Sequence, residues 1–254
     1  MIIVGSSRAM NHYNTQILAD SINSYLGSKY TFYNAGIGGN FVDCNACTVE
    51  SILNRYKPRL IIFETNLLEI KNIDWVKRMR RYETFYKNNS IVKDYLNRLG
   101  WNERIRVIIN MHRFNSKAVM IVDNLRHTKK ANTGYSPLYR IMNPADFKKE
   151  DDSYLYNNAN DFSINNLTRM ISLCKEMNVK LIISTSPRYN PNNNNELIHS
   201  LCNKLNTPYI ELYNTDYFNS HPELFYDKNH LNDNGATIYT QMFFEHLKPH
   251  LTGL

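Results

Sequence analysis

The chain has 254 residues, of which 43% are hydrophobic, so it can bury the core of one α/β domain, with or without an insertion. No apolar run approaches the roughly 18–20 residues of a membrane-spanning helix, which excludes a transmembrane segment in this sequence. The formal net charge is +7, and we show below that one segment carries the excess.

The first predicted strand is the short apolar run Ile2–Val4, which stops at once in Gly5-Ser6-Ser7-Arg8. Hydroxyl groups at the carboxyl end of a buried strand lie where open α/β sheets bind ligands. The same pattern is also typical of an ordinary strand-to-helix turn with a serine N-cap. Both interpretations stay open at this point of the chain.

Helices and strands then alternate. Apolar residues at spacings of three and four predict a helix over residues 11–27, ending near Gly27, and a second helix over residues 48–56. Short apolar runs predict strands over residues 30–33 and 60–63.

A polar or glycine-rich segment follows each of the first three strands. Ser7 follows the first strand, Gly39 belongs to the Asn34–Asn40 stretch after the second, and Asn66 follows the third. Glycines at this density demand a tight backbone or a close approach to a ligand, although the GxGxxG order of a dinucleotide fingerprint is absent. Strand–helix alternation predicts a parallel sheet, in which Ser7, Gly39 and Asn66 lie along one rim.

The four cysteines do not predict a metal or redox site. Cys44 and Cys47 have CxxC spacing, but no second pair and no paired histidines complete a zinc site. The pair is expected in a loop after the glycine-rich turn, which is not a thioredoxin-like setting. We therefore interpret Cys44, Cys47, Cys174 and Cys202 as incidental thiols.

A basic segment from about 71 to 150 interrupts the alternation. It holds 18 Lys and Arg against 7 Asp and Glu, a net charge of +11 that leaves −4 for the remainder. Helices are predicted over 75–95 and 102–124, so we expect a helical insertion packed over or beside the sheet rim. Its aromatic residues are expected to line a cap if the insertion binds a polyanionic glycan or another acidic substrate; they are Trp75, Tyr82, Phe85, Tyr86, Trp101 and Phe114.

Two other interpretations of the insertion stay open. It can equally be a solvated helical face or a contact for a partner. Nucleic-acid binding is not expected, since no recognised motif accompanies the charge.

Regular alternation returns after the insertion. Helices are predicted over 160–177, 196–205 and 236–247, and strands over 179–184 and 209–212. The loop 227–234 before the last helix contains Asp227-x-x-His230.

Three of these residues can perform nucleophilic catalysis together. A serine hydroxyl such as that of Ser7 is a poor nucleophile until a base accepts its proton, and a histidine such as His230 titrates in the range that this requires. Asp227 lies close enough in sequence to orient the imidazole. By itself, however, Asp-x-x-His is also typical of a surface loop with a helix N-cap, Asn66 of a strand-end cap, and Gly39 of a turn.

The order of these blocks resembles the SGNH hydrolase superfamily, the GDSL-type esterases and lipases. The blocks are Gly5-Ser6-Ser7, Asn34-x-Gly-x-Gly-Gly39, Glu64-Thr65-Asn66 and Asp227-x-x-His230, and they span nearly the whole chain in the family's order. The opening and the Tyr226–Ala236 ending look most like bacterial members with a large insertion between the Asn and His blocks. The resemblance implies a flavodoxin-like α/β/α sandwich, no metal or cofactor, and ester hydrolysis through an acyl-enzyme.

Carried over to this chain, the resemblance assigns five residues. Ser7 is the nucleophile, His230 the general base and Asp227 its orienting partner. The backbone N–H groups of Ser7 and Gly39 and the side-chain amide of Asn66 form the oxyanion hole. Neutral donors of this kind stabilise the tetrahedral oxyanion.

The sequence departs from the family pattern in two places. Ser6 replaces the usual Asp before the nucleophile and is a competing nucleophile, and Leu67 follows Asn66 where the family usually has Asp. Two further residues near Ser7 have open roles. His12 is expected to be structural rather than to line the pocket, and Arg8 either meets an anionic substrate group or forms a salt bridge.

These observations predict one domain over residues 1–254 that acts as a serine esterase on acetyl or other short acyl esters, plausibly of a carbohydrate. Alternatives are an O-acyltransferase with the same triad and a non-catalytic glycan-binding protein that kept the fold. The compartment stays open: no signal segment precedes the first strand, so we expect the cell envelope or secretion if a leader has been trimmed, and the cytoplasm otherwise.

Overall fold

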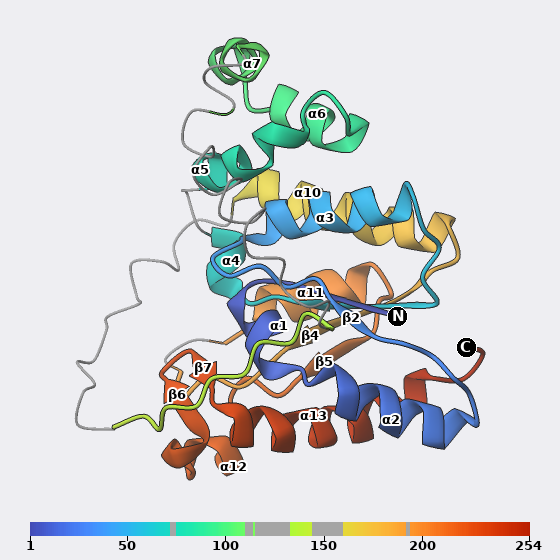
Figure 1. Cartoon of the computed structure of the whole chain (residues 1–254), viewed down its shortest axis with the longest axis vertical. Coiled ribbons are helices and arrows are strands. Elements are labelled where there is room, and N and C mark those ends of the chain that lie inside the picture. The colour runs from blue at the N-terminus through green and yellow to red at the C-terminus, as the bar shows by residue number, and fades with distance from the viewer. Residues whose placement is uncertain (72–74, 110–113, 115–132, 144–159, 192–193) are drawn as a thin grey trace, which may run out of the picture.

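The computed structural model of the chain describes residues 1–71, 75–109, 114, 133–143, 160–191 and 194–254. A parallel sheet of five strands lies at its centre, in the order β2-β1-β3-β4-β5 (Figure 1). The strands are β1 (Ile2–Val4), β2 (Tyr33–Asn34), β3 (Leu60–Glu64), β4 (Lys180–Thr185) and β5 (Tyr209–Glu211). This is the strand order of flavodoxin-like sheets, so the predicted fold class is confirmed.

Helices cover both faces of the sheet and complete three layers. On one face α3 (Val42–Leu53) lies beside α10 (Asp161–Glu176), and α11 (Glu196–Lys204) packs into the same core. On the other face α2 (Thr15–Leu26) lies beside α13 (Asp233–Leu247) (Figure 1).

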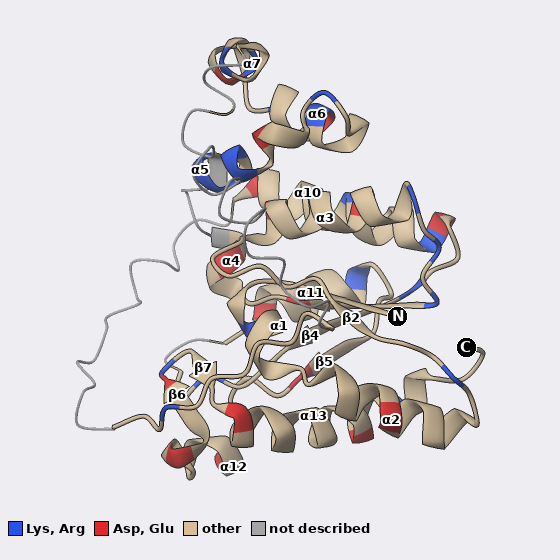
Figure 2. Ribbon diagram, in the orientation of Figure 1, with Lys and Arg blue, Asp and Glu red and all other residues tan. Residues whose placement is uncertain are grey.

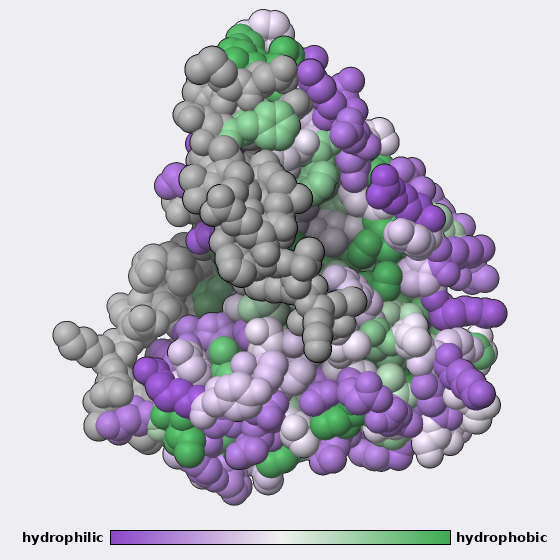
Figure 3. Space-filling view, in the orientation of Figure 1, coloured by the Kyte–Doolittle hydropathy of each residue, from purple (hydrophilic) through white to green (hydrophobic). Residues whose placement is uncertain are grey.

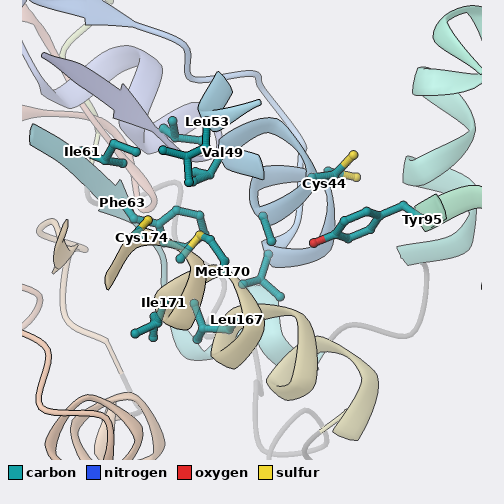
Figure 4. Packing of buried hydrophobic residues seen from close by; sticks show 14 of the residues in the cluster. Cys44, Val49, Leu53, Ile61, Phe63, Tyr95, Leu167, Met170, Ile171 and Cys174 are labelled. Atoms are coloured by element: carbon teal, nitrogen blue, oxygen red, sulfur yellow. The ribbon is translucent and has the colours of Figure 1, made fainter. Parts of the chain in front are cut away.

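The central strand β3 shows why the sheet needs helices on both sides. All five of its residues are buried, and successive side chains point to opposite faces. Ile61 and Phe63 pack against α3 and α10, as Figure 4 shows, whereas Leu60 and Ile62 belong to the core shared with α2 and α13.

Short elements lie at the carboxyl ends of the strands or connect the larger ones. Helix α1 (Ser7–His12) follows β1, α4 (Leu67–Lys71) follows β3, and α12 (Asp216–Asn219) follows β5. The strands β6 (Phe225–Asp227) and β7 (His230–Leu231) form an antiparallel hairpin where the sequence predicts a loop. Two 3₁₀ helices cover Pro222–Leu224 and Lys248–His250.

The described segment 133–143 of the basic insertion bonds to the backbone of Asn34, Met10 and Phe225. Residues 75–109 of the insertion form an outer layer over α3 (Figure 1). It consists of α5 (Trp75–Met79), a 3₁₀ helix (Arg80–Phe85), α6 (Ser90–Asn97) and α7 (Trp101–Ile108). The prediction of one continuous helix over 75–95 is therefore wrong. The side chain of Asn89 accepts from the N–H groups of Ile91 and Val92 and so caps a new helix, α6. The helix predicted over 102–124 ends at Ile108, and 110–113 and 115–124 lie outside the described residues.

Three other predictions need correction. Helix α3 begins at Val42 rather than near residue 48, so Cys44 and Cys47 lie on a buried helical face and not in a loop. The strand predicted over 30–33 is shorter and begins later, because β2 contains only Tyr33 and Asn34, which pair with β1. The helix predicted over 11–27 is divided, because the side chain of Asn14 caps α2; it ends at Gly27 as expected, with Gly27 in the left-handed conformation.

Hydrophilic side chains cover much of the periphery in Figure 3, and hydrophobic ones gather in small separate patches. Among the helices of the described ranges, none has the length and apolar character needed to cross a membrane.

Candidate active site

Ser7 lies at the turn between β1 and α1. It is the first residue of α1, a position whose N–H has no acceptor within the helix. The turn is tight at Gly5, where a Cβ would lie 2.7 Å from both the backbone O of Glu64 and Cβ of Ala9. Glycine therefore lets β1 approach β3 closely and directs Ser7 to the sheet rim.

The β6–β7 hairpin brings His230 to Ser7 from the far end of the chain. Ser7 Oγ lies 2.7 Å from His230 Nε2. On the other side of the ring, Nδ1 lies 2.9 and 3.0 Å from the two carboxylate oxygens of Asp227. Because a carboxylate can only accept, Nδ1 carries the proton and Nε2 is free to accept from the serine hydroxyl.

Asp227 is held as a carboxylate. Partial burial acts to raise its pKa, but the hydrogen bond and charge of His230 and the backbone N–H groups of Asn229 and His230 outweigh it. The pKa of Asp227 therefore lies below its usual value, as an orienting carboxylate requires.

Buried His12 anchors the hairpin to α1. Its Nε2 accepts a hydrogen bond of 2.9 Å from the N–H of Leu231, the residue after His230, and its Nδ1 lies 2.8 Å from Ser186 Oγ. Complete burial and the charges of His230 and Arg8 lower the pKa of His12 well below the ordinary histidine value. His12 is thus a neutral structural residue, as expected, and it supports the base without lining the cavity.

Gly39 and Asn66 lie on the same rim as Ser7. Gly39 has φ of +71°, which favours glycine, and Asn66 begins the turn into α4. Asn66 Nδ2 donates one hydrogen bond of 3.1 Å to Glu69 Oε1, and an amide nitrogen has a second N–H to offer. With His230, these three residues line one cavity of about 220 Å³.

The rival nucleophile Ser6 lines the same cavity, but its hydroxyl has a partner other than His230. Its hydroxyl donates a hydrogen bond of 2.6 Å to Glu69 Oε1, and the side chain is buried. Arg8 forms the salt bridge that was one of its two expected roles: its Nη2 lies 2.9 Å from Glu64 Oε1, and both side chains are buried.

The described aromatic side chains of the insertion do not form the expected cap. Tyr82, Phe85, Tyr86, Trp101 and Phe114 are not among the residues that line the cavity, and the side chain of Trp75 lies outside the described part. Tyr82 instead bonds Asn40 and Thr48, and Trp101 is 69% exposed. Within the described ranges, no group of three His, Cys, Asp or Glu residues could hold a metal ion.

No protein-family model matches the chain, and a search of curated proteins finds no match. Two solved structures match its fold at a TM-score of 0.52. One is protein YXIM from Bacillus subtilis, 16% identical, in which the match covers 100% of this chain and 57% of the other. The other is a two-domain esterase, CEX, active on acetylated mannans and crystallised with mannopentaose. It is 13% identical, and the match covers 98% of this chain and 48% of the esterase. The chain thus spans about half the length of these proteins.

The chain shares the three-layer α/β/α fold of these two proteins. The sequence predicted three strand ends on the rim of this sheet but missed the end of β4. Arg188 follows β4, lines the cavity, and donates a hydrogen bond of 2.7 Å from Nε to Asn229 Oδ1. Extending the argument about strand ends to β4 would have found it.

Glu69 is the second residue that sequence reasoning missed in this fold. It lies three residues after Asn66 and lines the cavity. The only local signal is that spacing, which brings residues together on a helical turn.

Proposed function

We propose that the chain is a serine esterase in which Ser7 is the nucleophile, His230 the general base and Asp227 its orienting partner. The observation that carries this proposal is the continuous contact from Ser7 Oγ through His230 to Asp227, with distances of 2.7 Å and 2.9 Å. The three-layer fold supports it, since Ser7 follows the carboxyl end of the parallel strand β1, where such sheets bind ligands, and the β6–β7 hairpin brings His230 and Asp227 to it.

The steps of ester hydrolysis follow from the tautomer of His230, in which Nδ1 carries the proton and Nε2 can accept one. As Ser7 Oγ bonds to the ester carbonyl carbon, its proton passes to His230 Nε2, and Asp227 stabilises the imidazolium. The Ser7 and Gly39 N–H groups and the Asn66 amide receive the carbonyl oxygen as it becomes an oxyanion. His230 then returns the proton to the departing alkoxide, and a water molecule, activated by the same base, releases the acyl group as a carboxylic acid.

A short acyl group suits the site. The cavity of about 220 Å³ is smaller than the roughly 300–1,000 Å³ typical of sites for drug-sized ligands. The structural similarity to an esterase active on acetylated mannans supports a carbohydrate acetate as the substrate class.

Replacing Ser7 tests the proposal directly. We expect Ser7→Ala to lower kcat for p-nitrophenyl acetate by about 10⁴-fold or more and to abolish labelling by a fluorophosphonate probe. His230→Ala should lower kcat to a similar degree, because the hydroxyl then has no base.

Ser6→Ala is the matched control. It removes the neighbouring hydroxyl, which faces Glu69, and should keep labelling and retain kcat within about tenfold of the wild type. Unchanged turnover in Ser7→Ala would reject the proposal. Transfer of acetyl to a sugar in competition with water would identify an O-acyltransferase, and glycan binding without labelling would identify a non-catalytic protein.

A further inference from the structure

Two arginines of the basic insertion reach the turn beside the nucleophile. The turn runs from Gly38 to Phe41; a Cβ on Gly38 would lie 3.9 Å from Ser7 Cβ, and Gly39, Asn40 and Phe41 line the cavity. This turn is therefore the wall of the site that faces the insertion. Figure 2 shows Lys and Arg residues on α5, the helix that carries Arg78.

Arg81 and Arg78 are positioned on this turn by neutral groups. Arg81 donates a hydrogen bond of 2.8 Å from Nη1 to the backbone O of Gly38. The guanidinium of Arg78 lies over the ring of Phe41, 5.3 Å from its centroid. Carbonyl and aromatic contacts orient a guanidinium without neutralising its charge.

The two positive charges converge on one point. A Cβ placed on Gly39 would lie 3.1 Å from Arg78 Nη1 and 3.4 Å from Arg81 Nη2. Like charges this close repel each other, and the repulsion is relieved when an anion lies between them.

Nearby carboxylates do not supply that anion. Four described carboxylates of α3, α4 and the insertion have other partners: Glu83 pairs with Arg106, Glu103 with Arg80, Asp43 accepts from Ser163 and Asn166, and Glu69 accepts from Ser6 and Asn66. Neither Arg78 nor Arg81 has a salt bridge within the described ranges.

We infer that Arg78 and Arg81 form a subsite for an anionic group, a carboxylate or a phosphate, that the substrate carries next to its acyl ester. Guanidinium groups match the geometry of both anions, because their N–H donors form a planar fork. The inference rests on the proposed function, since it names which esters the site prefers. An acidic sugar that bears an acetyl ester has this chemistry.

Three acetate esters test the inference. Para-acetoxybenzoate carries a carboxylate, para-acetoxyphenyl phosphate carries a phosphate, and methyl para-acetoxybenzoate is the neutral counterpart of the first. We expect Arg78→Gln and Arg81→Gln each to raise KM for an anionic ester about tenfold while kcat changes less than about twofold. Turnover of the neutral ester should stay within about twofold of the wild type.

Arg104→Gln is the matched control. Arg104 belongs to α7 of the same insertion, lies over the exposed ring of Trp101 and does not line the cavity, so the variant removes an equal charge outside the site. It should leave all three esters within about twofold of the wild type. Whichever anionic ester loses more in Arg78→Gln and Arg81→Gln identifies the preferred anion.

Equal loss for neutral and anionic esters would overturn the inference, because the arginines would then support the site generally. Binding is measured separately by calorimetry in Ser7→Ala, which should not turn the esters over. There, para-acetoxybenzoate should bind at least about tenfold more weakly once both arginines are replaced by Gln. This measurement holds even if the protein shows no esterase activity, and equal binding would also overturn the inference.

Discussion

Glu69 connects two residues of the cavity. Its Oε1 accepts hydrogen bonds from Ser6 Oγ at 2.6 Å and from Asn66 Nδ2 at 3.1 Å. Burial, reinforced by the nearby carboxylate of Glu64, raises the pKa of Glu69 to about 8. This side chain therefore holds a proton through the neutral range while it orients the amide that we propose for the oxyanion hole.

This proton makes the stability of the protein depend on pH. The folded chain keeps it up to about pH 8, whereas the unfolded chain loses it near 4.5, the ordinary pKa of a glutamate. Since the folded state binds more protons between these values, its contribution to the free energy of unfolding falls as the pH rises from about 4.5 to about 8. A glutamine does not titrate, so in Glu69→Gln the free energy of unfolding should fall less between these pH values than in the wild type. Urea unfolding at a series of pH values measures this difference.

Activity separates positioning by Glu69 from a purely electrostatic effect. Glu69→Gln keeps an acceptor for Ser6 and Asn66, so kcat at neutral pH should stay within about threefold of the wild type. Glu69→Ala leaves Asn66 without this partner, and kcat should fall about tenfold or more. If the free energy of unfolding changed equally with pH in the wild type and in Glu69→Gln between about pH 4.5 and 8, Glu69 would not be the residue that keeps this proton.

At the scale of elements, the β6–β7 hairpin matters most, because it carries both Asp227 and His230. Asn232 connects it to α13: its Oδ1 accepts from the N–H of Gly235 at 3.0 Å, and its Nδ2 donates to the backbone O of Glu223 at 2.7 Å. The position of the base thus depends on a helix cap.

Replacing this cap should affect stability and activity together. Asn232→Ala loses an N-cap and leaves a carbonyl without its donor, so the free energy of unfolding should fall by about 2–4 kcal/mol. We also expect kcat to fall several-fold, because His230 is two residues away. Asn160→Ala, which removes the cap of α10 at Phe162, should cost only about 1 kcal/mol and leave kcat unchanged. An unchanged kcat in Asn232→Ala would show that the hairpin is held by other contacts.

At the scale of the whole molecule, the four cysteines report on the integrity of the helices α3, α10 and α11 and of the core that these helices share. All four are free and buried, and burial raises the pKa of Cys44, Cys174 and Cys202 to about 12. Burial also raises the pKa of Cys47. Thiolates are therefore scarce in the folded protein at neutral pH.

A thiol reagent such as Ellman's reagent should therefore react with none of these residues in the native protein and with all four in denaturant. Reducing agents should not change esterase activity, because no thiol lines the cavity in the described part of the chain. Rapid reaction of one thiol under native conditions would show that the helix that carries it opens locally.

Much of the fold could be predicted because the signals are local. Buried strands such as β3 are continuous apolar runs, glycines and polar residues mark where each strand ends, and parallel strands place those ends on one rim. On that basis the sequence alone determined the α/β class and the grouping of Ser7, Gly39 and Asn66. It misplaced helix starts such as that of α3, because apolar residues of the first turn follow a glycine-rich segment that reads as a loop.

Only the tertiary structure decided which side chains meet. Ser7 and His230 are 223 residues apart, and Arg81 and Gly38 are 43 apart, so their contacts depend on how α1, the hairpin and the insertion pack around the sheet. Burial of Glu69 beside Glu64, which sets its protonation, likewise arises only when β3 and α4 are enclosed. Spacing along the chain carries periodicity, whereas distance, burial and pKa belong to the packed molecule.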